Sequence, residues 1–172
     1  MNLSHKEKIS ALHLCADILD YPDDDYKQKL GELQLLINSP IQDVELYHIQ
    51  AMYLDIFSIQ STRLKTVLYA SWWIDGKMSG VSSSRINDFY KKCGYTFDTE
   101  LVKKPVDHIS LMITFIAILL EEKRLKEIKE FAKFLTWTND FANSLDQASE
   151  IKYYKYAIDL SNNIINSIKG KV

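Results

Sequence analysis

The residues best suited to chemistry are an adjacent aspartate and histidine, Asp107 and His108, in the segment KKPVDHISLMITFIAILLEEK. A carboxylate beside an imidazole is the pairing that orients a general base in many hydrolases. If both residues lie on a helix, however, their side chains diverge by about 100° and do not face each other. The pair is therefore poorly placed to act as a catalytic dyad, and we predict that the protein is not an enzyme.

The usual catalytic and metal-binding signatures are missing from the sequence. It has no GxSxG nucleophile elbow, no phosphate-binding GxxxxGK[ST] and no dinucleotide-binding GxGxxG. Its histidines show no HExxH spacing, and Cys15 and Cys93 form neither a CxxC pair nor a zinc set. We predict no metal and no cofactor, and we interpret the two cysteines as buried free thiols in a reducing cytoplasm.

A second candidate feature is the aromatic segment VLYASWWIDGKM. Two adjacent tryptophans cannot easily face the same interior, so either Trp72 or Trp73 is a candidate for the wall of a groove, with Tyr69 nearby. The alternative is that these rings pack in the core. Asp75 and Asp107 would place carboxylates beside this aromatic surface. That combination suits a peptide that carries cations ahead of an apolar stretch.

The composition is that of an ordinary globular chain. Of 172 residues, 47% are apolar and 26% are charged, and the net charge of -2 implies no broad basic surface for nucleic acid. The longest apolar run, 109–120, is shorter than the roughly 20 residues that span a bilayer, and the first residues lack the apolar core of a secretory signal. We predict a cytoplasmic protein that binds no nucleic acid and does not insert into a membrane.

Helical spacing of apolar residues recurs along most of the chain, and only five glycines and three prolines interrupt it. The length suits one domain, which we place at 1–172. We predict an all-α fold, a single compact bundle of about seven to nine helices. The helices are expected at 4–19, 24–38, 42–59, within 67–78, around 86–93, and at 106–122, 124–135, 138–147 and 148–169.

The helix expected at 106–122 is apolar around most of its circumference, so we predict that it is the hub of the bundle. Pro105 and Asp107 are its start signals, because the proline nitrogen needs no partner there and the aspartate can cap free N–H groups. A capping Asp107 and a partly buried, satisfied His108 are the structural alternatives to a binding role. In a binding role, the pair would lie at an exposed rim where this helix begins.

Several segments occur in the order and approximate spacing of one known family. They are YLDIF (53–57), LYASWWIDG (68–76), INDFYKKCGY (86–95), PVDHISLMITFIAIL (105–119), FLTWTNDFANSL (134–145) and YYKYAIDL (153–160). Together they resemble the TorD/DmsD/NarJ family of cytoplasmic chaperones for molybdenum enzymes. The resemblance implies an all-α fold without catalysis. It also implies binding of the twin-arginine signal peptide or N-terminus of a molybdoenzyme, which is held back from export until its cofactor is inserted.

The resemblance also suggests which residues form the peptide site. In this family the Asp-His pair is linked to peptide binding, so that role carries over to Asp107 and His108. Aromatic and small positions near the groove carry over to Tyr53, Phe57, Tyr69, Ser71 and Trp73.

Two points stay open in the sequence. Many relatives have glutamates where this chain has Met112 and Thr114, and the sequence does not say whether this changes arginine recognition or which oxidoreductase is the client. The chain could act as a monomer or as a domain-swapped dimer. The alternative function is a helical adaptor or scaffold that binds an unrelated partner.

Overall fold

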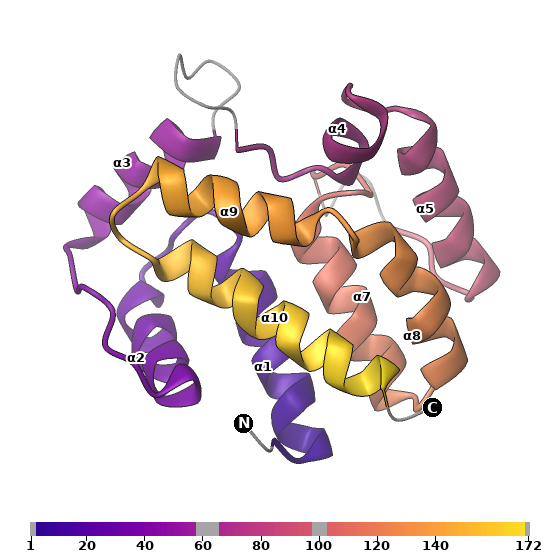
Figure 1. Ribbon diagram of the computed structural model, residues 1–172, viewed down its shortest axis with the longest axis horizontal. Helices are drawn as coiled ribbons and strands as arrows, with labels where there is room; N and C mark the ends of the chain where they lie inside the picture. The colour runs from indigo at the N-terminus through magenta and orange to yellow at the C-terminus, as the bar shows by residue number, and fades with distance from the viewer. Residues whose placement is uncertain (1–2, 58–65, 98–102, 171–172) are drawn as a thin grey trace.

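Helices form nearly all of the regular structure in the computed structural model, which describes residues 3–57, 66–97 and 103–170 (Figure 1). Within those residues the α-helices are α1 (His5–Ile18), α2 (Tyr26–Ile37), α3 (Leu46–Phe57), α4 (Ala70–Asp75), α5 (Val81–Lys92), α7 (Ile109–Glu121), α8 (Leu125–Phe131), α9 (Thr138–Ala148) and α10 (Tyr153–Lys169), with a 3-10 turn, η1 (Ala132–Leu135). The same residues contain no strand, only one isolated antiparallel bridge between Tyr69 and His108. The predicted all-α bundle is confirmed.

Helix α7 is buried in the bundle, as its apolar sequence predicts. Nine of its 13 residues are buried, and each large apolar side chain buried there contributes roughly 1.5–3 kcal/mol. Its most extensive packing is with α1, and α1 packs in turn on α10. Helices α9 and α10 cross the front of the bundle, with α1 and α7 behind them (Figure 1).

Several predicted helix starts are wrong, and local polar groups explain two of them. Helix α7 begins at Ile109 because His108 is extended, with φ -66° and ψ 134°, and accepts a hydrogen bond from the Ser110 N–H. The last helix begins at Tyr153 because the Ser149 hydroxyl accepts from the Ile151 N–H, a local bond that competes with helix formation. The short helix expected within 67–78 is confirmed as α4, and the residues before it pair with the start of α7.

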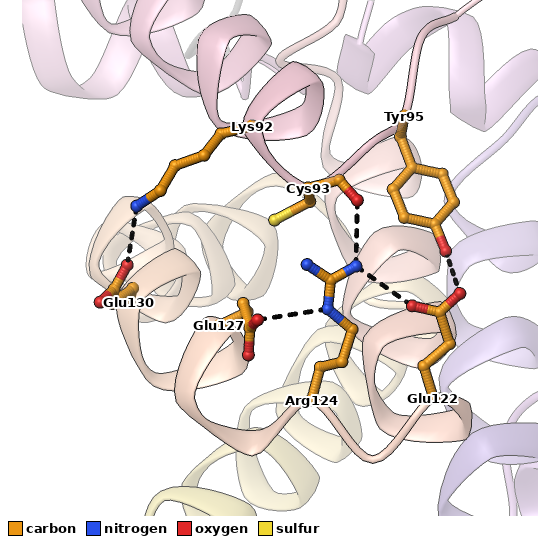
Figure 2. Close-up of polar contacts among 7 residues, drawn as sticks. All are labelled: Lys92, Cys93, Tyr95, Glu122, Arg124, Glu127 and Glu130. Carbon is orange, nitrogen blue, oxygen red and sulfur yellow. Dashed lines mark hydrogen bonds and ion pairs between the residues drawn. The ribbon is translucent and has the colours of Figure 1, made fainter.

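At its far end, α7 is fixed to α5 by a surface network around Arg124 (Figure 2). The Arg124 guanidinium donates to the carbonyl of Cys93, just past α5, at 3.0 Å. It also contacts Glu122 and Glu127, each at 3.3 Å, and the Tyr95 hydroxyl donates to Glu122. These five residues are called the Arg124 network below.

The state of the two cysteines and the hydropathy of the helices agree with the predictions made from the sequence. Cys15 and Cys93 are free and buried. In the part of the chain that the structure describes, no helix is both long and apolar enough to cross a bilayer.

Candidate functional site

Asp107 is a buried helix cap, but for α4 and not for the helix that follows it. One carboxylate oxygen accepts from the Ser71 N–H at 2.8 Å, and its backbone carbonyl accepts from the Ala70 N–H at 3.0 Å. Both N–H groups lie in the first turn of α4 and have no acceptor within the helix itself. The helix dipole also favours a negative charge at this end. The other oxygen accepts from the Ser83 hydroxyl of α5 at 3.2 Å. Asp107 therefore connects the starts of three helices.

Asp75 caps the start of α5. Its Oδ2 accepts from the backbone N–H and the hydroxyl of Ser82, at 2.8 and 2.6 Å, and these two bonds lower the pKa of the carboxyl group. Gly80 makes this approach possible, because a Cβ at that position would lie 2.8 Å from the Asp75 Cβ. The carboxylate that the sequence offers as a groove acid is thus engaged at the start of α5.

His108 is buried rather than placed at an exposed rim, so that part of the sequence prediction is wrong. Its side chain is 4% exposed, and Asp107 is 1% exposed. The cause is the pairing of the residues before α7 with those before α4: Ile109 N–H donates to the Leu68 carbonyl at 2.8 Å, and Tyr69 bridges to His108. This pairing covers both side chains.

The contacts of His108 define its protonation. Its Nδ1 accepts from the Ser110 N–H at 3.2 Å and lies 2.7 Å from the Ser110 hydroxyl, which places the ring proton on Nε2. Burial lowers the pKa of the imidazole to about 4, against the opposing effects of Asp20 and Asp107. His108 is therefore neutral near pH 7.

Asp20, which sequence reasoning missed, is the carboxylate whose charge most strongly raises the pKa of His108, and the effect of Asp107 is smaller. Asp20 Oδ2 lies 2.5 Å from the Lys104 ammonium, whereas its Oδ1 is buried and has no hydrogen-bond partner within 3–57, 66–97 and 103–170. Burial first, and then the charge of Asp20, raise the pKa of Tyr53. We call Asp20, Tyr53, Tyr69, Lys104 and His108 the Asp20 cluster.

A signal for Asp20 was present in the sequence. It directly follows the first expected helix, 4–19, in the stretch DYPDD that separates this helix from the one expected at 24–38. A carboxylate just past a helix C-terminus faces the negative end of the helix dipole and needs a compensating cation. Nothing in the sequence shows that the cation is Lys104, 84 residues away.

A band of aromatic rings extends from Tyr53 of the Asp20 cluster and includes residues of four helices. The members of this aromatic band are Tyr53 and Phe57 of α3, Trp73 of α4, Trp137 and Phe141 at α9, and Tyr154 of α10. Tyr53 contacts Phe57 at 4.8 Å between ring centroids, and Phe57 lies 6.4 Å from Phe141. Trp73 lies 6.0 Å from Phe141 and stacks on Trp137 at 5.7 Å. The band therefore joins α3, α4, α9 and α10.

The two tryptophans of α4 take different positions. Trp73 packs into the aromatic band, and its indole N–H donates to the Val67 carbonyl at 2.7 Å. Both rings are half-buried, but the stacking of Trp73 supports the core alternative for that residue. Trp72 remains the better candidate for a groove wall.

The predicted site residues thus separate into three groups. Tyr53, Tyr69 and His108 lie in the Asp20 cluster, and Phe57 and Trp73 in the aromatic band. Asp107, Ser71 and Asp75 hold α4 and α5, and Ser71 is 0% exposed with a hydroxyl that has no hydrogen-bond partner in the described part of the chain. Of the positions where relatives have glutamates, Met112 is fully buried and Thr114 is half-buried.

The described residues offer no metal centre. Within 3–57, 66–97 and 103–170, no group of three or more His, Cys, Asp or Glu side chains is arranged to hold a metal ion.

An all-α bundle that combines a buried polar cluster with an aromatic band has the features of a helical binding protein. The model of the nitrate reductase delta subunit family matches residues 20–148, so the chain belongs to this family of NarJ/TorD-type chaperones. The family is non-catalytic and serves the maturation of redox enzymes, which confirms the predicted chaperone class and the absence of catalysis.

A solved structure has the same fold. The crystal structure of a redox enzyme maturation protein from Archaeoglobus fulgidus is 24% identical and superimposes with a TM-score of 0.66, covering 95% of this chain and 96% of that chain. Among proteins of curated function, none matches this chain.

Proposed function

We propose that this chaperone works in the cytoplasm and binds the twin-arginine signal peptide or N-terminus of a molybdenum oxidoreductase. Binding would delay export of the enzyme until its cofactor is inserted. The observation that carries the proposal is the position of Tyr53, which belongs to both the Asp20 cluster and the aromatic band. A carboxylate and an apolar surface are thereby joined in one continuous site.

The ligand has a matching order of chemical groups. A twin-arginine signal presents two guanidinium groups followed by an apolar segment. Guanidinium–carboxylate contacts contribute about 1.5–3 kcal/mol as charged hydrogen bonds, and each buried apolar side chain contributes a similar amount. In this site the cations would meet the Asp20 cluster and the apolar segment would lie along Phe57, Trp72 and Trp73.

The remaining predicted residues have supporting roles in the proposal. Asp107 and Ser71 set the start of α4, which carries both tryptophans, and Asp75 sets α5 beside it. His108 stays neutral and places its ring 5.4 Å from Tyr69, edge to face. These residues position the surface that meets the peptide.

Isothermal titration calorimetry with synthetic signal peptides tests the function. We expect saturable binding of the signal from an oxidoreductase encoded beside this chaperone, and weaker binding of a copy with both arginines replaced by lysine. Trp72→Ala should reduce the affinity with unchanged circular dichroism. Tyr47→Ala is the matched control, since Tyr47 is an aromatic residue of α3, 64% exposed, outside the aromatic band. Absence of saturable binding for every candidate peptide would refute the proposal.

A further inference from the structure

We propose that Asp20 is the arginine-binding carboxylate of this site, and that Lys104 is a built-in cation that occupies it when no peptide is bound. The inference rests on the proposed function and adds the residue that recognises arginine and the group that competes with it. Four observations lead to it: the position of Asp20 at a helix end, its half-satisfied carboxylate, the backbone that delivers Lys104, and the neighbouring rings.

Asp20 occupies an unfavourable place for a negative charge. It follows the C-cap of α1, and its backbone N–H donates to the Asp17 carbonyl in the last turn at 3.2 Å. The C-terminal end of a helix carries partial negative charge, which repels a carboxylate. An acid placed there depends on a cation for its stability, and in the peptide-free protein that cation is Lys104.

Lys104 satisfies only half of the carboxylate. Its ammonium lies 2.5 Å from Oδ2, while Oδ1 is buried and has no hydrogen-bond partner among the residues that the structure describes. A buried acceptor without a partner is unfavourable, and an ammonium group acts as a single point charge. A guanidinium group presents two parallel N–H donors that match both oxygens of a carboxylate. The site is therefore better suited to arginine than to the lysine that occupies it.

The segment that delivers Lys104 lies outside any helix. Lys103 has a φ of 46°, in the left-handed region that residues with side chains rarely adopt. The turn ends where the His108 N–H donates to the Pro105 carbonyl at 3.0 Å, so Lys104 lies between a strained residue and a fixed turn. Withdrawing its side chain breaks one ion pair whose two members are each 33% exposed and disrupts no helix.

The neighbours of Asp20 connect it to the rest of the site. Its charge acts on both His108 and Tyr53, and Tyr53 begins the aromatic band. A peptide with an arginine on Asp20 would therefore have its next residues at the aromatic band. Displacement of Lys104 makes binding selective, because a peptide must offer a cation that binds Asp20 better than the internal lysine does.

Fluorescence anisotropy with a labelled twin-arginine peptide tests this with four variants. Lys104→Met should tighten binding by about fivefold or more, because the competitor is gone. Lys104→Arg keeps the net charge but supplies an internal guanidinium, so it should weaken binding. Asp20→Asn should weaken binding by about tenfold or more. In the double variant D20N/K104M, removal of Lys104 should bring no gain, because its effect acts through Asp20.

The matched control is Lys155→Met. Lys155 pairs with Asp159 at the same 2.5 Å, with side-chain exposures of 24% and 38%, so its loss changes net charge and removes a similar ion pair. K155M should bind like the wild type. Circular dichroism and thermal unfolding of each variant show whether it is folded.

The outcomes separate the two proposals. If the wild-type protein binds the peptide but K104M and K104R both bind equally well, the Asp20–Lys104 inference is wrong and the proposed function stands. If D20N binds like the wild type, Asp20 is not the arginine site. If the folded wild-type protein binds no signal peptide, both proposals fail.

Discussion

The two ends of α7 hold polar groups of the same kinds in opposite surroundings. At its start, Asp107 and His108 are buried, with 1% and 4% exposure. At its end, the side chains of Glu122 and Arg124 are 42% and 27% exposed in the Arg124 network (Figure 2). Buried polar groups must find partners within the protein, whereas exposed ion pairs compete with water and contribute little.

The ends also differ in how completely their polar atoms are paired. Among described residues, five buried side-chain atoms have no hydrogen bond: Asp20 Oδ1 and the hydroxyls of Tyr26, Thr66, Ser71 and Tyr154. Three of them, in Asp20, Ser71 and Tyr154, belong to the Asp20 cluster, the start of α4 or the aromatic band. A folded protein normally avoids such atoms, so the three that lie within the proposed site support its role in binding. The Arg124 network joins the end of α7 to the end of α5.

The largest expected effect follows from removing the buried cap. Asp107→Ala should lower the free energy of unfolding by about 3 kcal/mol, because a charged hydrogen bond to the Ser71 N–H is lost and that group is left buried. Urea denaturation followed by circular dichroism measures this. Asp107→Asn keeps an acceptor and should lose less.

Glu122→Ala at the other end is the control for this change and should leave the unfolding midpoint near that of the wild type. If Asp107→Ala were as harmless as Glu122→Ala, burial would not distinguish the two ends.

A pH dependence should follow from His108. Above its ordinary pKa of about 6.5 the imidazole is neutral in both states and stability is complete. As the pH falls toward the folded-state pKa of about 4, only the unfolded protein takes up the proton, so stability is lost. The loss should be about 2 kcal/mol between pH 7 and pH 5.

His108→Asn should remove that part of the pH dependence, because an asparagine oxygen can still accept from the Ser110 N–H but does not titrate. Unfolding curves at both pH values measure it, with the exposed His48→Gln as the control that keeps the wild-type slope. An identical slope in H108N and the wild type would show that His108 is not held neutral by burial.

A smaller effect is expected at the exposed end. Arg124→Ala removes the donor to the Cys93 carbonyl and two ion pairs, so the unfolding midpoint should fall by at most about 3 °C. The difference should shrink further in 1 M salt, which screens exposed charges. Differential scanning calorimetry at low and high salt measures both values. A larger loss that persists in salt would mean that the two ends are equally important to stability.

The sequence predicted the fold well because helical periodicity is a local signal. The apolar circumference of 109–120 identified α7 as buried, and the ordered series of segments around the Asp-His motif indicated the family. Prediction from the sequence failed for interactions between residues that are distant along the chain. Asp107 accepts a hydrogen bond from the Ser71 N–H, 36 positions away, and Asp20 pairs with Lys104, 84 positions away. No rule of sequence spacing connects residues so far apart. The sequence therefore predicted which residue types form the candidate site, but not the hydrogen bonds and ion pairs among them.

The smallest expected effect concerns the aromatic band. The Tyr154 hydroxyl is buried and has no hydrogen bond to any described residue, so Tyr154→Phe removes an unsatisfied group and keeps the ring contacts with Tyr53 and Phe57. Its stability should equal that of the wild type or rise by up to about 1 kcal/mol. Urea denaturation measures the change, and Tyr90→Phe is the matched control, since it removes a hydroxyl that donates to the Val106 carbonyl at 3.0 Å and should destabilise. A loss of stability in Y154F would show that this hydroxyl is hydrogen-bonded in solution, which would remove one of the three unpaired atoms that support the proposed site.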